Sequence, residues 1–168
     1  MNQTLKSLLI DTKLGQMIAI ADEKYLYLLE FTDCKKCDRE IKNLKNEVRS
    51  NIVSGKNIIL KKIEKELKNY FSGKDFNFTT PMKLIGSDFQ KNVWKTLQKI
   101  SPGKTQSYLD TAKAIKKPKA FRAVANANGA NKLAIIIPCH RVINTDGKMG
   151  GYAGGIARKE WLLAHEKK

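Results

Sequence analysis

The sequence has few cysteines, few acidic side chains and no long apolar run. Cysteine occurs only at positions 34, 37 and 139, which excludes a disulfide scaffold and fits a reducing compartment. The longest aliphatic run, residues 133–137, is far too short to span a bilayer. The first residues also lack the basic-then-apolar order of a signal peptide. We therefore expect no membrane partner and a cytoplasmic protein, or a nuclear one in a eukaryotic host.

Basic side chains outnumber acidic ones two to one. The chain holds 32 Lys and Arg against 16 Asp and Glu, a formal net charge of +16. Residues 86–168 hold 16 basic and 5 acidic side chains, so their net charge is +11, against +5 for residues 1–85. A positive field of this kind favours an anionic partner such as nucleic acid. The alternative is a lysine-rich surface that serves only to keep the protein in solution.

The first half of the chain predicts a small α+β unit. Three short apolar segments, separated by turn-forming residues, predict an antiparallel meander: 5–10, 16–21 and 25–31. Apolar residues then recur at helical spacing near 41–48 and 60–70. We expect this domain to span residues 1–80. Residues 72–86 contain two glycines and Pro81 without periodicity, and are expected to form a linker.

The second half, residues 86–168, predicts a mainly helical domain. Ser87 or the next residue can cap a first helix, and Ser107 can cap a second, short one. Pro118 suits the first turn of a third helix, about residues 119–128. Two short helices joined by a tight turn, the second carrying basic residues, suggest a helix-turn-helix. A simple packing pair is the alternative.

Cys139 stands in the most reactive setting of the chain. Pro138 precedes it and fixes the backbone, and the basic residues His140 and Arg141 follow at once. Nearby basic groups lower a thiol pKa and favour the nucleophilic thiolate. The alternative is a buried, inert cysteine. Adjacent residues of an extended strand point to opposite faces, so His140 needs a water or a chain turn to reach the thiol proton.

The six residues 137–142, Ile-Pro-Cys-His-Arg-Val, resemble the active-site signature of the O6-alkylguanine-DNA alkyltransferases. Other positions resemble the family in the same order: Phe89-Gln90, Val93-Trp94, Gly103-Lys104-Thr105, Ser107-Tyr108, Pro118-Lys119-Ala120, Arg122-Ala123-Val124, Asn131, 151–155 and 159–163. The resemblance covers residues 86–166, whereas the first half matches only in layout. It implies an α+β fold, and a DNA repair protein that accepts one alkyl group per molecule. The group comes from O6 of guanine, with O4-alkylthymine as a further candidate, and no metal or organic cofactor is implied.

The same resemblance assigns the chemistry residue by residue. Cys139 is the nucleophile and alkyl acceptor, and His140, Glu160 and a water draw off its proton. Asn131 braces the active-site turn and favours the thiolate. Tyr108 helps to rotate the phosphate and donates to guanine N3, so that guanine does not leave as a full anion.

The resemblance also implies how DNA is bound. The helix-turn-helix enters the minor groove of a duplex that contains an alkylated base, and Arg122 fills the gap left by the extruded nucleotide. Tyr108, Thr145 and Lys119 contact the DNA. The base pocket is formed by Val142, Tyr152 and Ala153. Further candidates for phosphate contacts are Lys116, Lys117 and Lys132. We expect the protein to act as a monomer.

Two other functions remain as alternatives. One is a non-catalytic sensor or helix-turn-helix regulator that flips alkylated bases, although family members of that type lack the cysteine that stands here at 139. The other is a Cys–His hydrolase, which would need an oxyanion hole.

The pair Cys34 and Cys37 has the spacing of a metal or redox site. Because no second Cys or His pair lies near it, we expect a surface turn.

Overall fold

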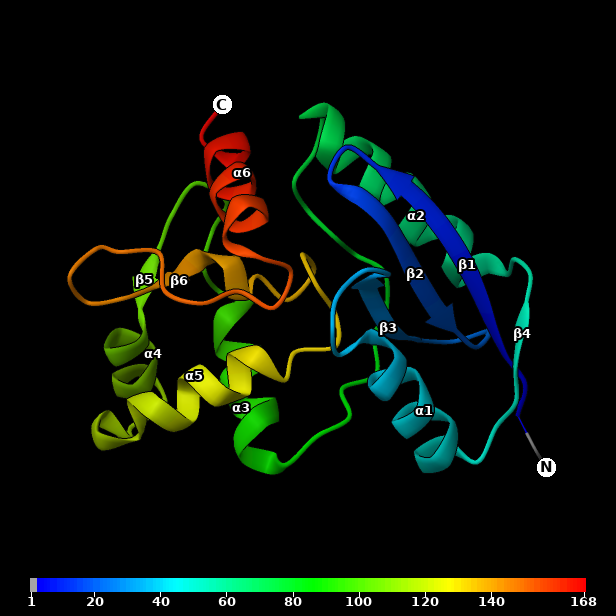
Figure 1. Ribbon diagram of the computed structural model, residues 1–168, viewed down its shortest axis with the longest axis horizontal. Helices are drawn as coiled ribbons and strands as arrows, with labels where there is room; N and C mark the ends of the chain where they lie inside the picture. The colour runs from blue at the N-terminus through cyan, green and yellow to red at the C-terminus, as the bar shows by residue number, and fades with distance from the viewer. Residues whose placement is uncertain (1–2) are drawn as a thin grey trace. The chain divides into compact units, whose positions relative to one another are not determined.

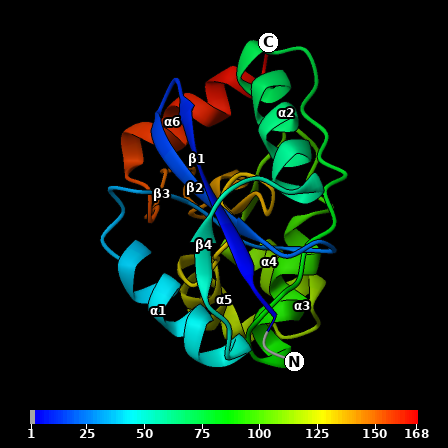
Figure 2. The same cartoon turned by 90° about the vertical axis from the view of Figure 1, so that its right-hand side faces the viewer.

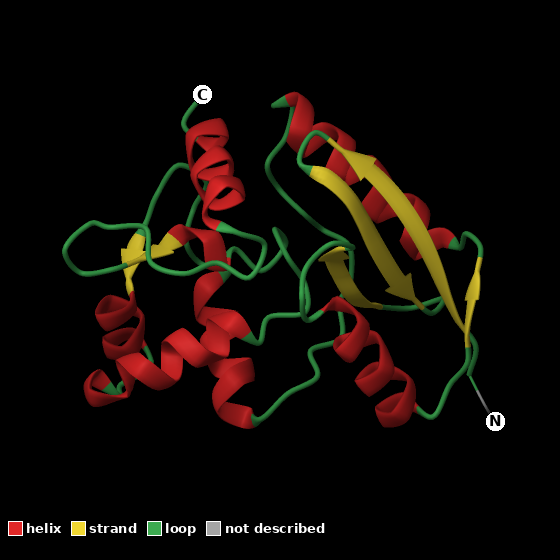
Figure 3. Ribbon diagram, viewed as in Figure 1, coloured by secondary structure: helices red, strands yellow, loops and turns green. Residues whose placement is uncertain are grey.

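The computed structural model describes residues 3–168, and the chain divides between Leu84 and Ile85 into two compact units (Figure 1). The first unit combines a sheet with two helices, and the second is mainly helical (Figure 3). The protein is therefore α+β, as the sequence predicted. Within residues 3–168, no helix has both the length and the apolar composition needed to cross a membrane.

The sheet of the first unit has four strands in the order β3-β2-β1-β4. They are β1 (Leu5–Thr12), β2 (Gly15–Ala21), β3 (Leu26–Phe31) and β4 (Ile52–Ser54). The first three form the predicted antiparallel meander. The fourth runs parallel to β1 along its edge (Figure 2). The strand β4 was not predicted from the sequence, because three residues are too few to show a period of two.

Two helices accompany the sheet, α1 (Cys37–Val48) and α2 (Ile58–Ser72). The Asn57 side chain caps α2 by accepting from the Leu60 N–H at 2.8 Å. Gly73 ends the helix with a φ of 77°, a conformation that favours glycine. The face of α2 that packs on β1 and β2 is apolar and fully buried at its centre: Leu60, Ile63, Leu67 and Tyr70.

Residues 72–86, expected to be a linker, are packed against the first unit for much of their length. Both Thr79 and Thr80 donate to the Glu66 carboxylate through backbone and hydroxyl. Farther along, the Leu26 N–H donates to the Pro81 carbonyl at 2.8 Å. This segment therefore covers the outer edge of β3, which would otherwise expose unpaired backbone groups.

Cys34 and Cys37 lie in the turn that leads into α1, but the expectation of a surface position is wrong. Their exposed fractions are 9% and 3%. Between the two cysteines, the Lys36 ammonium pairs with the buried carboxylates of Glu30 at 3.5 Å and Glu40 at 3.2 Å, so this segment is packed against the unit rather than solvated. Burial raises the pKa of both thiols, to about 11 for Cys37. No group of three or more potential metal ligands occurs in the described sequence.

The second unit contains four α-helices, two 3-10 turns and a pair of two-residue strands. The helices are α3 (Asp88–Leu97), α4 (Tyr108–Ala114), α5 (Phe121–Gly129) and α6 (Ile156–Glu166). The turns are η1 (Pro118–Ala120) and η2 (Cys139–Arg141). The strands, β5 (Gln106–Ser107) and β6 (Val142–Ile143), pair in parallel.

Local capping explains where the first two of these helices begin. Ser87 and Gln90 form a capping box at the start of α3, and Ser107 and Asp110 form another at the start of α4. The Trp94 indole donates to the Ala127 carbonyl at 2.9 Å and so joins α3 to α5. The turn η1 links α4 to α5, and the two helices pack together as the expected helix-turn-helix.

Candidate active site

Cys139 lies in the single turn η2. The Arg141 N–H closes this turn on the Pro138 carbonyl at 2.9 Å. Residues 133–138, which lead into it, are all buried. Cys139 and His140 are therefore not successive residues of an extended strand. A chain turn at this point was one of the two ways, besides a bridging water, by which His140 could reach the thiol proton.

A buried ion-pair network holds His140 and Arg141. His140 Nε2 lies 2.7 Å from Oε1 of Glu166. Arg141 donates to both Glu166 oxygens at 2.8 Å, and also to the Ile100 carbonyl at 2.6 Å. A carboxylate that accepts a two-pronged arginine is fixed in orientation. Glu166 in turn fixes the His140 ring.

Glu160 was expected to orient His140, and this expectation is wrong. Glu160 is exposed, and Glu166 takes the place beside the imidazole. Six residues along an α-helix turn the side chain by about 240°, so the two carboxylates face different ways. The sequence does contain an indication that Glu166 faces inward. Glu166 follows the buried Leu162 and Leu163 by four and three residues, on the apolar face of α6.

The surroundings leave His140 neutral and Glu166 charged. Burial lowers the pKa of His140 below its ordinary value, against the hydrogen bond and charge of Glu166, which raise it. Burial would raise the pKa of the Glu166 carboxyl, but hydrogen bonds from His140 and Arg141 outweigh it and lower that pKa. With Nε2–H donating to Glu166, Nδ1 is the basic ring nitrogen. Nδ1 is buried and hydrogen-bonds to no protein atom in the described range.

Asn131 braces the turn and touches the sulfur. Its amide Nδ2 donates to the Ile137 carbonyl at 2.9 Å and lies 3.3 Å from Cys139 Sγ. Its Oδ1 accepts from the Leu133 N–H at 2.9 Å. An N–H directed at sulfur stabilises the thiolate more than the thiol. The structure therefore brings Asn131 and Cys139 together as the resemblance implied.

Cys139 opens onto a hollow of about 250 Å³. Its lining comes from α4, α5, η2 and the glycine-rich loop before α6: Tyr108, Ala125, Asn128, Gly129, Cys139, Gly151, Tyr152 and Ala153. Gly150 adjoins it with a φ of 66°, and a Cβ there would lie 3.3 Å from the Tyr108 ring. A larger residue would press the loop onto Tyr108, so glycine is needed at this position. The expected pocket residues Tyr152 and Ala153 are among these lining residues, whereas Val142 is not.

The residues expected to meet DNA lie on the surface of the second unit. Lys119 is exposed in η1, and Arg122 is exposed in the first turn of α5. Thr145 is exposed in the loop that follows β6. Val142 is buried, and its carbonyl accepts a hydrogen bond from Lys159 at 2.6 Å. The second unit thus combines the buried Cys139 and His140 with exposed basic residues in η1 and α5.

Comparison with known proteins agrees with this arrangement over the whole chain. The family model for the DNA binding domain of 6-O-methylguanine DNA methyltransferase matches residues 88–168, and that for its ribonuclease-like domain matches residues 5–84. The chain is 40% identical over 159 residues to the methylated-DNA–protein-cysteine methyltransferase of Methanosarcina barkeri, with 95% of each chain covered. The chain belongs to this methyltransferase family.

Solved structures of methyltransferases are also similar to it. The O6-methylguanine methyltransferase of Mycobacterium tuberculosis superposes with a TM-score of 0.82 at 36% identity, covering 97% of this chain and 93% of that one. The OGT of the same organism in complex with DNA gives a TM-score of 0.83 at 35% identity, with coverage of 98% and 92%. The likeness therefore includes both units.

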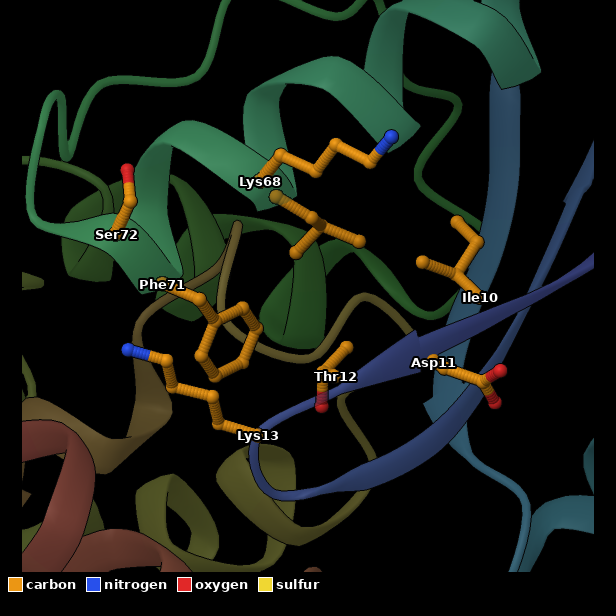
Figure 4. A pocket seen from close by; sticks show the side chains of 8 residues that line it. Ile10, Asp11, Thr12, Lys13, Lys68, Phe71 and Ser72 are labelled. Carbon is orange, nitrogen blue, oxygen red and sulfur yellow. The ribbon is translucent and has the colours of Figure 1, made fainter.

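A second hollow, of about 440 Å³, lies in the first unit of the methyltransferase chain (Figure 4). It is bounded by the turn between β1 and β2 and by α2. Its lining contains no cysteine or histidine: Ile10, Asp11, Thr12, Lys13, Leu67, Lys68, Phe71 and Ser72. The smaller hollow, by contrast, has a cysteine, Cys139, in its lining.

Proposed function

We propose that this protein repairs DNA by moving one alkyl group per molecule from O6 of guanine to Sγ of its own Cys139. One observation carries the proposal: the reduced Cys139 lines a hollow and is followed directly by the buried His140–Glu166 pair. Relatives along the whole chain are named for the same transfer, and one was crystallised with DNA. The substrate is duplex DNA that contains the alkylated base.

The chemistry follows from the surroundings of the thiol. His140 Nδ1 takes the Cys139 proton through a water, and the Glu166 carboxylate stabilises the imidazolium that forms. Sγ then attacks the alkyl carbon, so that the S–C bond forms while the C–O6 bond breaks. The electron pair stays on guanine, and a hydrogen bond from the Tyr108 hydroxyl to N3 spreads its charge. The proton from the thiol ends on the released guanine, and the thioether remains on the protein.

The alkylated base must leave the stack before this can happen. O6 lies inside the duplex, and extrusion costs least for a badly paired base. We assign the minor groove to the helix pair α4 and α5, with Arg122 in the gap left by the base. Lys119 and Thr145 contact phosphates, and Val142, Tyr152 and Ala153 hold the extruded base. One lesion needs one acceptor, so the protein acts as a monomer. It must work wherever the DNA is, which is the cytoplasm of a cell without a nucleus and the nucleus of a eukaryotic cell.

Mass spectrometry of the reacted protein tests the transfer. Trypsin cuts after Lys132 and Arg141, so the peptide 133–141 carries Cys139 and neither of the other cysteines. After incubation with a duplex that contains O6-methylguanine, we expect this peptide to gain one methyl group, with one group transferred per protein molecule. A duplex with O4-methylthymine tests the second substrate in the same way.

The Cys139→Ala variant is the matched control, and we expect it to bind the lesion duplex without transfer. An unmodified peptide 133–141 in a parent protein that binds the duplex would overturn the transfer and favour the sensor. Release of more than one equivalent of product per protein would instead indicate a hydrolase.

A further inference from the structure

Lys159 is a fully buried lysine at the centre of the second unit. Its exposed fraction is 0%, and it is among the largest side chains of the protein that solvent does not reach. From α6 its ammonium donates to the Val142 carbonyl at 2.6 Å and to the Gly151 carbonyl at 3.2 Å. It also lies 6.0 Å from the centre of the Tyr108 ring. Lysine is almost never buried so completely without an anionic partner.

No carboxylate of residues 3–168 pairs with this ammonium. The one nearby carboxylate of the network, Glu166, is already held by His140 and Arg141. Burial lowers the pKa of Lys159, and the negative charge of the Cys139 thiolate raises it. A Coulomb attraction acts equally on both partners. The same interaction therefore favours the thiolate over the thiol.

The Lys159 charge also acts on the base. Burial lowers the pKa of His140, and the charges of Arg141 and Lys159 lower it further. The hydrogen bond and the charge of Glu166 raise it. A neutral imidazole is the form that can accept a proton. Tyr108, the other titratable group near the thiol, has its pKa raised by burial and by the Cys139 charge. It therefore stays protonated and contributes no competing anion.

The hydrogen bonds of Lys159 join two walls of the Cys139 hollow. Val142 follows η2 directly, and Gly151 stands in the glycine-rich loop that lines the hollow. A loop with Gly150 and Gly151 has little side-chain packing of its own, so a donor that reaches its carbonyl fixes its position.

We propose that Lys159 is a positioning residue that holds a positive charge beside the Cys139 thiolate and ties the glycine-rich loop to the active-site turn. The proposal rests on Cys139 being the acceptor of the proposed function, but the charge beside the thiol does not depend on DNA. The two can therefore be tested apart.

The test measures alkylation of Cys139 by iodoacetamide as a function of pH, from the mass of the peptide 133–141. Iodoacetamide reacts with a thiolate and releases iodide, so the pH midpoint of the rate reports thiolate formation. Lys159→Gln removes the charge but can still donate hydrogen bonds, whereas Lys159→Arg keeps the charge. Lys148 is an exposed lysine of the same unit, and Lys148→Met serves as the control.

We expect Lys159→Gln to move the midpoint up by about one pH unit, which slows the reaction roughly tenfold at pH values below the parent midpoint. Its rate at high pH should stay close to that of the parent. Lys159→Arg and Lys148→Met should keep the parent midpoint. An unshifted midpoint in Lys159→Gln, with or without a lower plateau, overturns the charge role and leaves only a structural one.

A measurement on the parent protein covers the case in which the variants fail to fold. The Lys159 pKa, followed by carbon NMR at Cε, should fall once iodoacetamide has capped Cys139 and removed the thiolate charge. An unchanged Lys159 pKa would overturn the proposal. Normal capping without any transfer from methylated DNA would instead count against the proposed function alone.

Discussion

Glu160 and Glu166 belong to one helix and offer a direct comparison at the scale of single residues. Glu166 accepts from His140 and Arg141 in a site that solvent does not reach, while Glu160 is exposed. We expect Glu166→Gln to slow methyl transfer about 10²-fold, because general-base catalysis contributes on this scale. We expect Glu160→Gln to leave the rate unchanged. Single-turnover kinetics on an O6-methylguanine duplex measures both.

Loss of folding must be separated from loss of catalysis in that comparison. Glu166→Gln leaves the buried Arg141 guanidinium without its carboxylate, which costs about 3–5 kcal/mol of stability. Urea denaturation of both variants gives the folded fraction, and the rates are compared on folded protein. Equal rates in the two variants would remove Glu166 from the mechanism.

Residue identity was predictable where the chemistry is local in sequence. Cys139, His140 and Asn131 follow from the signature and its neighbours, and the structure places Asn131 against the sulfur. Glu166 was not found, because the choice between two acids on one helix depends on helical phase. Lys159 belongs to a segment that resembles the family, but no role was predicted for it. A lysine in a helix is ordinarily solvated, and only the tertiary fold buries this one.

At the scale of elements, the junction of β3 and α1 buries two carboxyl groups beside one ammonium group. Glu30 in β3 and Glu40 in α1 are both buried, and the Lys36 ammonium pairs with both carboxylates. Burial raises the pKa of Glu30 from 4.5 to about 7, in spite of the Lys36 charge, which lowers it. Between these values the folded state binds the proton more tightly than the unfolded state does. The free energy of unfolding must therefore fall as pH rises through this window.

We expect this junction to cost the parent protein about 1–3 kcal/mol of stability on going from about pH 5 to pH 8. Urea denaturation at several pH values measures it. Other groups titrate in the same range, so the comparison is with Glu30→Gln, in which this part of the pH dependence should vanish. Glu64→Gln, on a partly exposed pair with Lys56, should retain it. Parallel curves for the parent and Glu30→Gln would contradict the assignment.

Elements were predictable from sequence where a period or a cap was long enough to read. The three strands of the meander and the helices from α1 to α5 were expected from apolar spacing and capping residues, and the structure contains them. The strand β4 and the turn η2 were not, because each has three residues. The packing of residues 79–83 on the first unit was also missed, because it depends on contacts far apart in sequence.

At the scale of the whole molecule, charge is divided unevenly between the two halves. The second half carries a net charge of +11 and also the match to a DNA binding domain. If its lysines neutralise phosphates, binding releases counterions and weakens as salt rises. The first half has the same number of basic residues but more acidic ones, so its lysines offset their own carboxylates. The composition alone could not separate these two roles.

Charge removal in each half tests this division. Lys116→Gln with Lys119→Gln removes two exposed lysines beside the helix pair. We expect the negative slope of log K against log salt to become shallower by about 1.8, since each phosphate contact contributes about 0.9 to its magnitude. Lys61→Gln with Lys65→Gln, which removes two exposed lysines of α2, should leave that slope unchanged. Fluorescence anisotropy with a labelled duplex at several salt concentrations measures both. An equal change of slope in the two double variants would mean that DNA binding depends on the total charge of the protein rather than on the lysines beside α4 and α5.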